Sequence, residues 1–118
     1  MKTTLKLEEL AQLLFAIGLF SMLDYKWWWY LVLFLAPDIG MLGYLVNTKF
    51  GAFTYNVFHH KGIAIGFMLA GMFYLGDLYT FIGTLLYGHA AFDRALGYGL
   101  KFSDSFQNTH LGRVGKDK

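Results

Sequence analysis

Residues 27–46 read WWWYLVLFLAPDIGMLGYLV, and this stretch decides the fold. Its length is that of a helix that crosses a bilayer, which needs about 20 predominantly apolar residues. It holds one charged residue, Asp38, directly after the only proline of the chain, Pro37. The aromatic cluster that opens it is typical of a membrane–water interface. We therefore expect a membrane-spanning helix that kinks at Pro37, where a backbone carbonyl loses its donor.

The composition of the whole chain agrees with a lipid environment. Of the 118 residues, 56% are hydrophobic and 15% charged, whereas soluble proteins average about 45–50% and about 25%. The absence of cysteine excludes a disulfide scaffold and a Cys-ligated metal site. A net charge of +2 is too small for a nucleic-acid-binding face, so we expect no nucleic acid partner. The length predicts a single integral membrane domain, residues 1–118.

Three further apolar stretches predict three more helices, at about 5–23, 52–76 and 78–100, followed by a polar tail at 101–118. The first is interpreted as an uncleaved helix, because acidic residues stand where the basic region of a signal peptide would be. Basic residues at the N-terminus, at Lys49 and in the tail fall on one side of this scheme. The positive-inside rule then predicts an all-α, four-helix transmembrane bundle with both termini in the cytoplasm.

A stripe of small residues runs along the third predicted helix. Gly62, Gly66 and Ala70 recur every fourth residue, so they share one face and allow a neighbouring backbone to approach closely. This pattern predicts a packing surface, against which another helix of the chain or a second copy of the protein in a homo-oligomer could pack.

Polar residues interrupt three of the predicted helices at similar depths. Counting inward from the cytoplasmic ends at about 1.5 Å per residue places Asp38, Asn56, His59 and Asp93 at one level. The pairs Asn56/His59 and His89/Asp93 each occupy one helix face. Ionisable groups inside a bilayer cost about 2.5–3.5 kcal/mol each and therefore face partners in the bundle interior. We predict one shared polar cluster, with the following members: Asp38, Asn56, His59, His89, Asp93 and Arg94.

One hypothesis for this cluster is a metal site. Imidazole and carboxylate groups from facing helices are ligands that zinc, manganese and iron accept, with positions left for water. Asp38, His59, His89 and Asp93 would be the ligands of a divalent metal. The metal would acidify a bound water for hydrolysis of a membrane-borne substrate, and Arg94 would neutralise a phosphate or carboxylate on it, as a catalytic or substrate-orienting residue.

Two other hypotheses explain the same residues. In one, His59 and His89 are axial ligands of a haem in an electron carrier, although Asn56 and Asp93 suit an apolar porphyrin poorly. In the other, the Asp and His side chains satisfy each other and fix helix register, in a non-enzymatic protein that binds a small ligand, an ion or a partner helix.

Three polar residues lie near the cluster in sequence without an obvious place in it. His60 and Lys61 fall on other faces of the third predicted helix and are interpreted as interfacial residues. His110 belongs to the tail, where a solvated surface position competes with a tail folded over the pocket mouth.

Five short motifs, in this order, resemble one known family: Pro37-Asp38 through Met41-Leu42-Gly43-Tyr44-Leu45, Tyr55-Asn56 with His59, His89 with Asp93-Arg94, Leu96-Gly97-Tyr98-Gly99-Leu100-Lys101, and Thr109-His110-Leu111-Gly112. The family is a bacterial membrane family catalogued as domain of unknown function number 4260, and the resemblance covers about residues 7–112. It implies a small multi-pass protein of the bacterial inner membrane. It marks as motif positions Asp38, Asn56, His59, His89, Asp93, Arg94 and His110, and it implies no established activity.

Overall fold

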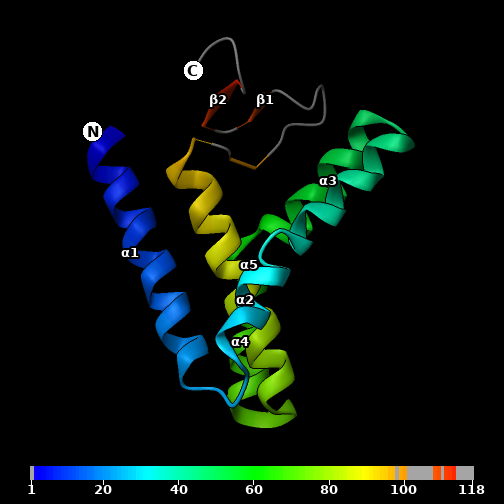
Figure 1. Ribbon diagram of the computed structural model, residues 1–118. Helices are drawn as coiled ribbons and strands as arrows, with labels where there is room; N and C mark the ends of the chain where they lie inside the picture. The colour runs from blue at the N-terminus through cyan, green and yellow to red at the C-terminus, as the bar shows by residue number, and fades with distance from the viewer. Residues whose placement is uncertain (1, 98, 101–107, 110, 114–118) are drawn as a thin grey trace.

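The computed structural model describes residues 2–97, 99–100, 108–109 and 111–113. The chain is helical, as predicted, but these residues form five α-helices rather than the four expected (Figure 1). Two short helical segments and a pair of two-residue antiparallel strands complete the described part. In chain order the elements are α1 (Lys2–Ser21), α2 (Trp27–Leu33), η1 (Ala36–Leu45), α3 (Thr48–His59), α4 (Lys61–Ala70), η2 (Gly71–Leu75), α5 (Asp77–Ala95), β1 (Asn108–Thr109) and β2 (Gly112–Arg113).

The stretch 27–46 is interrupted where the sequence predicts it. The α-helix α2 ends at Leu33, and the narrower 3₁₀ helix η1 begins at Ala36. Pro37 lies in the first turn of η1, a position that proline tolerates because a first-turn N–H has no partner within the helix. The result is a change of helix type as well as direction, and it places Asp38 in the first turn of η1.

The prediction of one continuous helix over 52–76 is wrong, because the chain breaks at His60. This residue has extended backbone angles, φ −85° and ψ 118°, between α3 and α4. Its side chain accepts a hydrogen bond from the Ile63 N–H and so caps α4. The break lets α3 pack on η1 while α4 packs on α5. Asn47 caps the start of α3 in the same way, accepting from the Phe50 N–H at 2.7 Å.

Small residues bring the helices together, but they are not the predicted stripe. A Cβ atom at Gly83 of α5 would lie 2.6 Å from the Met68 backbone nitrogen of α4, so this contact requires glycine. A Cβ atom at Gly66 would meet nothing within 4 Å. Within the described residues, α4 therefore faces α5 through Ala64 and Met68, and the face that carries Gly62 and Gly66 points outward.

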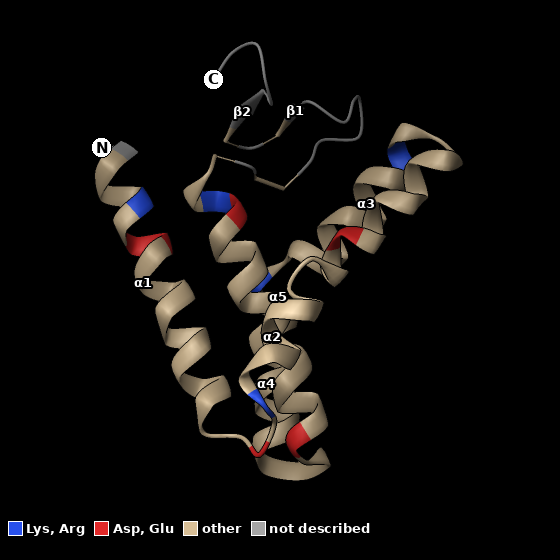
Figure 2. Cartoon of the chain, viewed as in Figure 1, with Lys and Arg blue, Asp and Glu red and all other residues tan. Residues whose placement is uncertain are grey.

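The elements alternate between two ends of the molecule (Figure 1). The starts of α1 and α3 and the end of α5 lie at one end, and the α1–α2 and η2–α5 turns lie at the other. Helix α5 is central, since α1 and α4 both pack along it, while η1 and α3 form a separate arm. Figure 2 shows charged residues near both ends and near the junction of α3 with α5.

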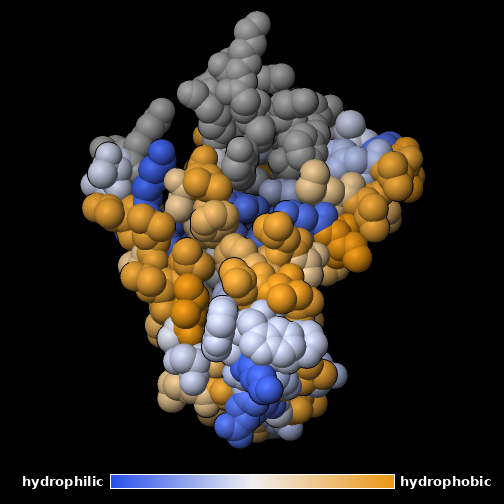
Figure 3. Space-filling model, in the orientation of Figure 1, coloured by the Kyte–Doolittle hydropathy of each residue, from blue (hydrophilic) through white to orange (hydrophobic). Residues whose placement is uncertain are grey.

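The outer surface is strongly apolar. Large hydrophobic side chains stand exposed on several helices, among them Leu14 (69%), Leu31 (67%) and Phe53 (64%), and Figure 3 shows such side chains spread over the visible face. In the part of the chain that the structure describes, one helical stretch, Trp27–Leu45, is long and apolar enough to cross a membrane. The apolar stretch Lys61–Leu75 is shorter.

Candidate metal centre

Four side chains that are distant in sequence meet where η1, α3 and α5 come together. They are Asp38, His59, His89 and Asp93, and one ligand atom from each lies within 4.8 Å of all the others. The Nε2 atom of His59 lies 3.1 Å from Asp38 Oδ1 and 3.2 Å from Asp93 Oδ2. The Nε2 atom of His89 lies 3.1 and 3.3 Å from the same two oxygens.

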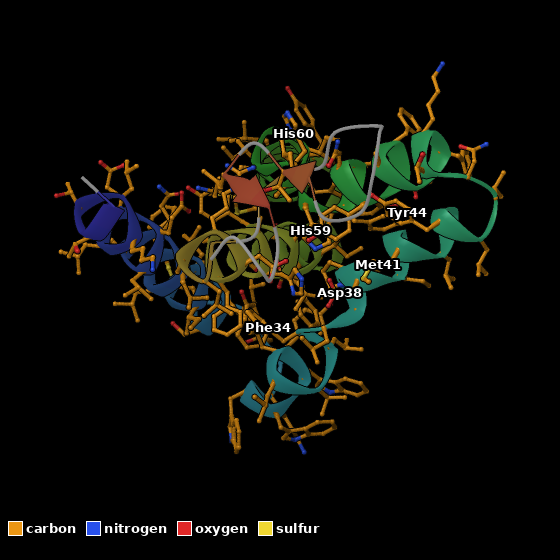
Figure 4. The ribbon with its side chains drawn as sticks, turned by 90° about the horizontal axis from the view of Figure 1, so that it is seen from above. Phe34, Asp38, Met41, Tyr44, His59 and His60 are labelled. Atoms are coloured by element: carbon orange, nitrogen blue, oxygen red, sulfur yellow. The ribbon has the colours of Figure 1, made fainter. Side chains whose placement is uncertain are left out.

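Each of the three elements places its residue by local geometry. His89 and Asp93 are one turn apart on α5, so they share a face. His59 is the last residue of α3, and the break at His60 allows that helix end to stop against α5. Asp38 reaches the cluster because α2 ends at Leu33 and the chain re-enters a helix at Ala36. Figure 4 shows Asp38 and His59 facing one another at the centre of the molecule.

The second nitrogen of each imidazole contacts a backbone carbonyl. The His59 Nδ1 atom lies 2.8 Å from the Tyr55 oxygen, and the His89 Nδ1 atom lies 2.6 Å from the Phe34 oxygen. A carbonyl oxygen only accepts, so the hydrogen-bond network assigns a proton to both Nδ1 atoms. In the neutral imidazole, Nε2 then carries a lone pair. Both Nε2 lone pairs face the carboxylates.

The consequence is a convergence of four electron-pair donors. Two neutral Nε2 atoms and two carboxylate oxygens repel one another unless a positive charge lies among them. Either the imidazoles or carboxylates take up further protons, or a cation occupies the centre. A metal with ligand distances of about 2.0–2.2 Å places neighbouring ligand atoms about 3 Å apart, which is close to the 3.1–3.3 Å observed.

Burial differs sharply among the four side chains. His89 is completely buried, and His59 and Asp93 retain 4% and 15% exposure. Asp38 is 39% exposed. The cluster is therefore most open on the side of Asp38.

Tyr55 and Phe34 support the cluster, and the predicted site did not include them. The Tyr55 ring stacks on the His59 ring with centroids 3.8 Å apart, and its hydroxyl donates to Asp93 Oδ2 at 3.4 Å. The Phe34 ring contacts His89, with centroids 5.4 Å apart. Tyr55 precedes His59 by one turn of α3, so the i, i+4 spacing points to it. Phe34 lies between α2 and η1 and contacts His89 55 residues away, so no local spacing points to it.

The other residues of the predicted site are Arg94, Asn56 and His110. Arg94 is half-buried, and its guanidinium donates to the His59 carbonyl at 3.5 Å. Asn56 is half-buried on α3, one turn before the exposed cap residue His60. His110 lies outside the described residues, as does most of the predicted tail at 101–118.

Lys61 is not only an interfacial residue, as the sequence predicted, because it has partners on another helix. Its ammonium contacts Glu9 Oε2 and Gln12 Oε1 of α1, both at 2.5 Å, and the Lys61 and Glu9 side chains are only 16% and 17% exposed. Tyr87 of α5 donates to the same Gln12 oxygen at 3.1 Å. Glu9 is thus held in a second polar contact that ties α1 to α4 and α5.

The geometry opposes the haem hypothesis for these two histidines. Their ring centroids are 4.8 Å apart, and both Nε2 atoms face the same two carboxylates. A porphyrin between the rings would have to lie where the Asp38 and Asp93 oxygens are.

Comparison with known proteins identifies one relationship. The family model described as Domain of unknown function (DUF4260) matches residues 2–114. The chain matches no curated protein and no solved structure.

Proposed function

We propose that this chain, which belongs to the DUF4260 family of domains of unknown function, is a membrane protein that binds one divalent metal ion through Asp38, His59, His89 and Asp93. Membership of this family implies no reaction, so the proposal rests on the geometry of the site. The helices are proposed to form a multi-pass membrane bundle with both termini in the cytoplasm.

One observation carries the metal assignment: the same oxygen of each carboxylate contacts both imidazoles. Asp38 Oδ1 and Asp93 Oδ2 each lie 3.1–3.3 Å from both Nε2 atoms. If the cluster consisted of two separate imidazolium–carboxylate pairs, each Nε2 proton would be donated to the oxygen of one carboxylate only. Four atoms converging on one point is the arrangement expected of ligands, and two carboxylates balance the charge of a divalent ion.

The surroundings have the features that metal ligands usually need. Each histidine donates its other N–H to a backbone carbonyl, which fixes the ring orientation and the tautomer. The Tyr55 hydroxyl donates to the Asp93 oxygen that faces the histidines. Such outer contacts typically contribute 10- to 100-fold to metal affinity.

The reaction class that fits this donor set is hydrolysis. A bound divalent metal supplies a water whose pKa is lowered to about 7. The half-exposed Asp38 lies on the side that water reaches. Arg94, next to Asp93 and against the His59 carbonyl, carries the fixed positive charge that would orient an anionic group of the substrate.

Metal content tests the proposal directly. Wild-type protein purified without chelator and dialysed against a divalent metal should retain about one equivalent by elemental analysis. The His59→Ala/His89→Ala double variant should retain none, because a metal affinity built on four ligands does not survive the loss of two.

The matched control is His60→Ala, which removes the neighbouring exposed histidine and should keep the metal. That substitution removes the cap of α4 and costs about 1 kcal/mol of stability, so it also controls for mild destabilisation. Metal retained by the double variant, or absent from reloaded wild-type protein, would refute the metal centre. The second result would favour the paired Asp and His side chains of a non-enzymatic protein.

A further inference from the structure

An apolar cavity of about 490 Å³ lies between α1 and the segment that contains α2. Its volume falls within the range of about 300–1,000 Å³ that is typical of small-molecule sites. Its walls are almost entirely apolar or aromatic, with contributions from α1, α2 and α5: Leu13, Ile17, Trp27, Leu31, Phe34 and Phe92. No residue of the candidate metal centre lines it.

The cavity and the metal centre nevertheless share a wall. Phe34 lines the cavity, while its carbonyl accepts from His89 Nδ1 and its ring contacts the His89 ring. Phe92, which also lines the cavity, packs edge-to-face on Phe34 and directly precedes Asp93. Asp38 follows Phe34 by four residues, across the break between α2 and η1, and both lie near the centre of the view in Figure 4. The Phe34 wall of the cavity thus borders the candidate metal centre at His89.

The cavity is accessible from the apolar outer surface. Ile17, Trp27 and Leu31 line it and are 41%, 72% and 67% exposed. A hydrocarbon chain would find apolar contacts along these side chains, whereas a polar group would find few partners along the walls. A polar group at the end of such a chain would find partners only beyond the Phe34 wall, at the candidate metal centre, where Asp38 is 39% exposed.

From this continuity we infer that the cavity holds the single hydrocarbon chain of an amphiphilic substrate whose anionic head, a phosphate or carboxylate, lies at the Asp38 side of the metal centre. The inference rests on the proposed metal centre and specifies its substrate class. The chain supplies affinity through burial, and the metal and Arg94 attract the head.

Binding of n-alkyl phosphates of increasing length tests this. Metal-loaded protein in phosphatidylcholine nanodiscs is titrated with four- to ten-carbon alkyl phosphates, and the signal from empty nanodiscs is subtracted. Affinity should rise about fourfold for each added methylene, corresponding to about 0.8 kcal/mol per buried CH₂. An n-alkyl carboxylate series shows which anionic head is preferred. In Mn²⁺-loaded protein, the ³¹P signal of bound octyl phosphate should broaden, because the head lies at the metal.

The variant Ile17→Trp fills the cavity and should abolish the dependence on chain length while metal content stays at one equivalent. The matched control is Leu14→Trp on the same helix, which adds the same bulk at an exposed position outside the cavity and should behave as wild type.

The outcomes separate the two proposals. One equivalent of metal with affinity that is independent of chain length, or chain binding without ³¹P broadening, would overturn the amphiphile inference and leave the metal centre standing. No metal, together with a chain-length dependence that Ile17→Trp removes, would refute the metal centre and the head position but retain the chain site.

Discussion

At the scale of single residues, a substitution at Asp93 tests whether this residue is a metal ligand or only a structural partner of the two histidines. Its Oδ2 atom lies 3.2 and 3.3 Å from the two Nε2 atoms, so replacement by Asn keeps the shape and removes the charge. A metal at 100 times its Kd stabilises a protein by about 2.7 kcal/mol. We expect wild-type protein to melt several degrees higher with metal than with EDTA, and Asp93→Asn to lose at least half of that difference.

The comparison is made by thermal unfolding of both proteins in each condition. Asp24→Asn, in the exposed turn after α1, is the control and should show the full metal effect. An equal loss of Tm in EDTA and in metal would instead identify Asp93 as a structural partner of His59 and His89.

At the scale of elements, the contact between α4 and α5 depends on Gly83. A Cβ atom there would approach the Met68 nitrogen at 2.6 Å and the Ala64 carbonyl at 2.8 Å, which are backbone atoms that cannot rotate away. Gly83→Ala should therefore destabilise the protein by about 1–3 kcal/mol. Gly66→Ala on the facing helix meets nothing within 4 Å and should be neutral or stabilising by about 0.5–1 kcal/mol.

Chemical unfolding of the two variants in one detergent measures this difference. It also tests the predicted small-residue stripe, because a homo-oligomer that packs through Gly62, Gly66 and Ala70 would make Gly66→Ala the disruptive substitution. A reversed order of stability, with a change in oligomeric state, would restore that stripe as the contact surface.

At the scale of the whole molecule, the alternation of helix ends predicts the sidedness of the chain in a membrane. The start of α3 lies at the end of the molecule that carries the start of α1, and the α1–α2 turn lies at the other end (Figure 1). The chain has no cysteine, so a single introduced cysteine is the only thiol of the protein that a maleimide can label. In intact cells, Met22→Cys should react with a membrane-impermeant maleimide, and Thr48→Cys should react only after permeabilisation.

Both positions are exposed and uncharged, so neither substitution disturbs the balance of basic residues. Labelling of both cysteines in intact cells would contradict the four-span arrangement and would favour a protein bound to one face of the membrane.

The sequence by itself determined the helical class, the interruption near Pro37 and the identity of the four clustered side chains. It could do so because these depend on short-range regularities. A 3.6-residue period places His89 and Asp93 on one face, and the cost of buried charge predicts that Asp38 and His59 find partners. The metal they would bind, the sidedness and the oligomeric state stay predictions.

Only the tertiary structure decided where the third predicted helix breaks, which partner Lys61 takes and how the histidines are oriented. The residues on both sides of His60 permit a helix, and the break depends on α3 packing against η1 while α4 packs against α5. Lys61 and Glu9 are 52 residues apart, and His89 and the Phe34 carbonyl are 55 apart. No local pattern specifies such pairs, because their energy exists only once distant helices have been brought together.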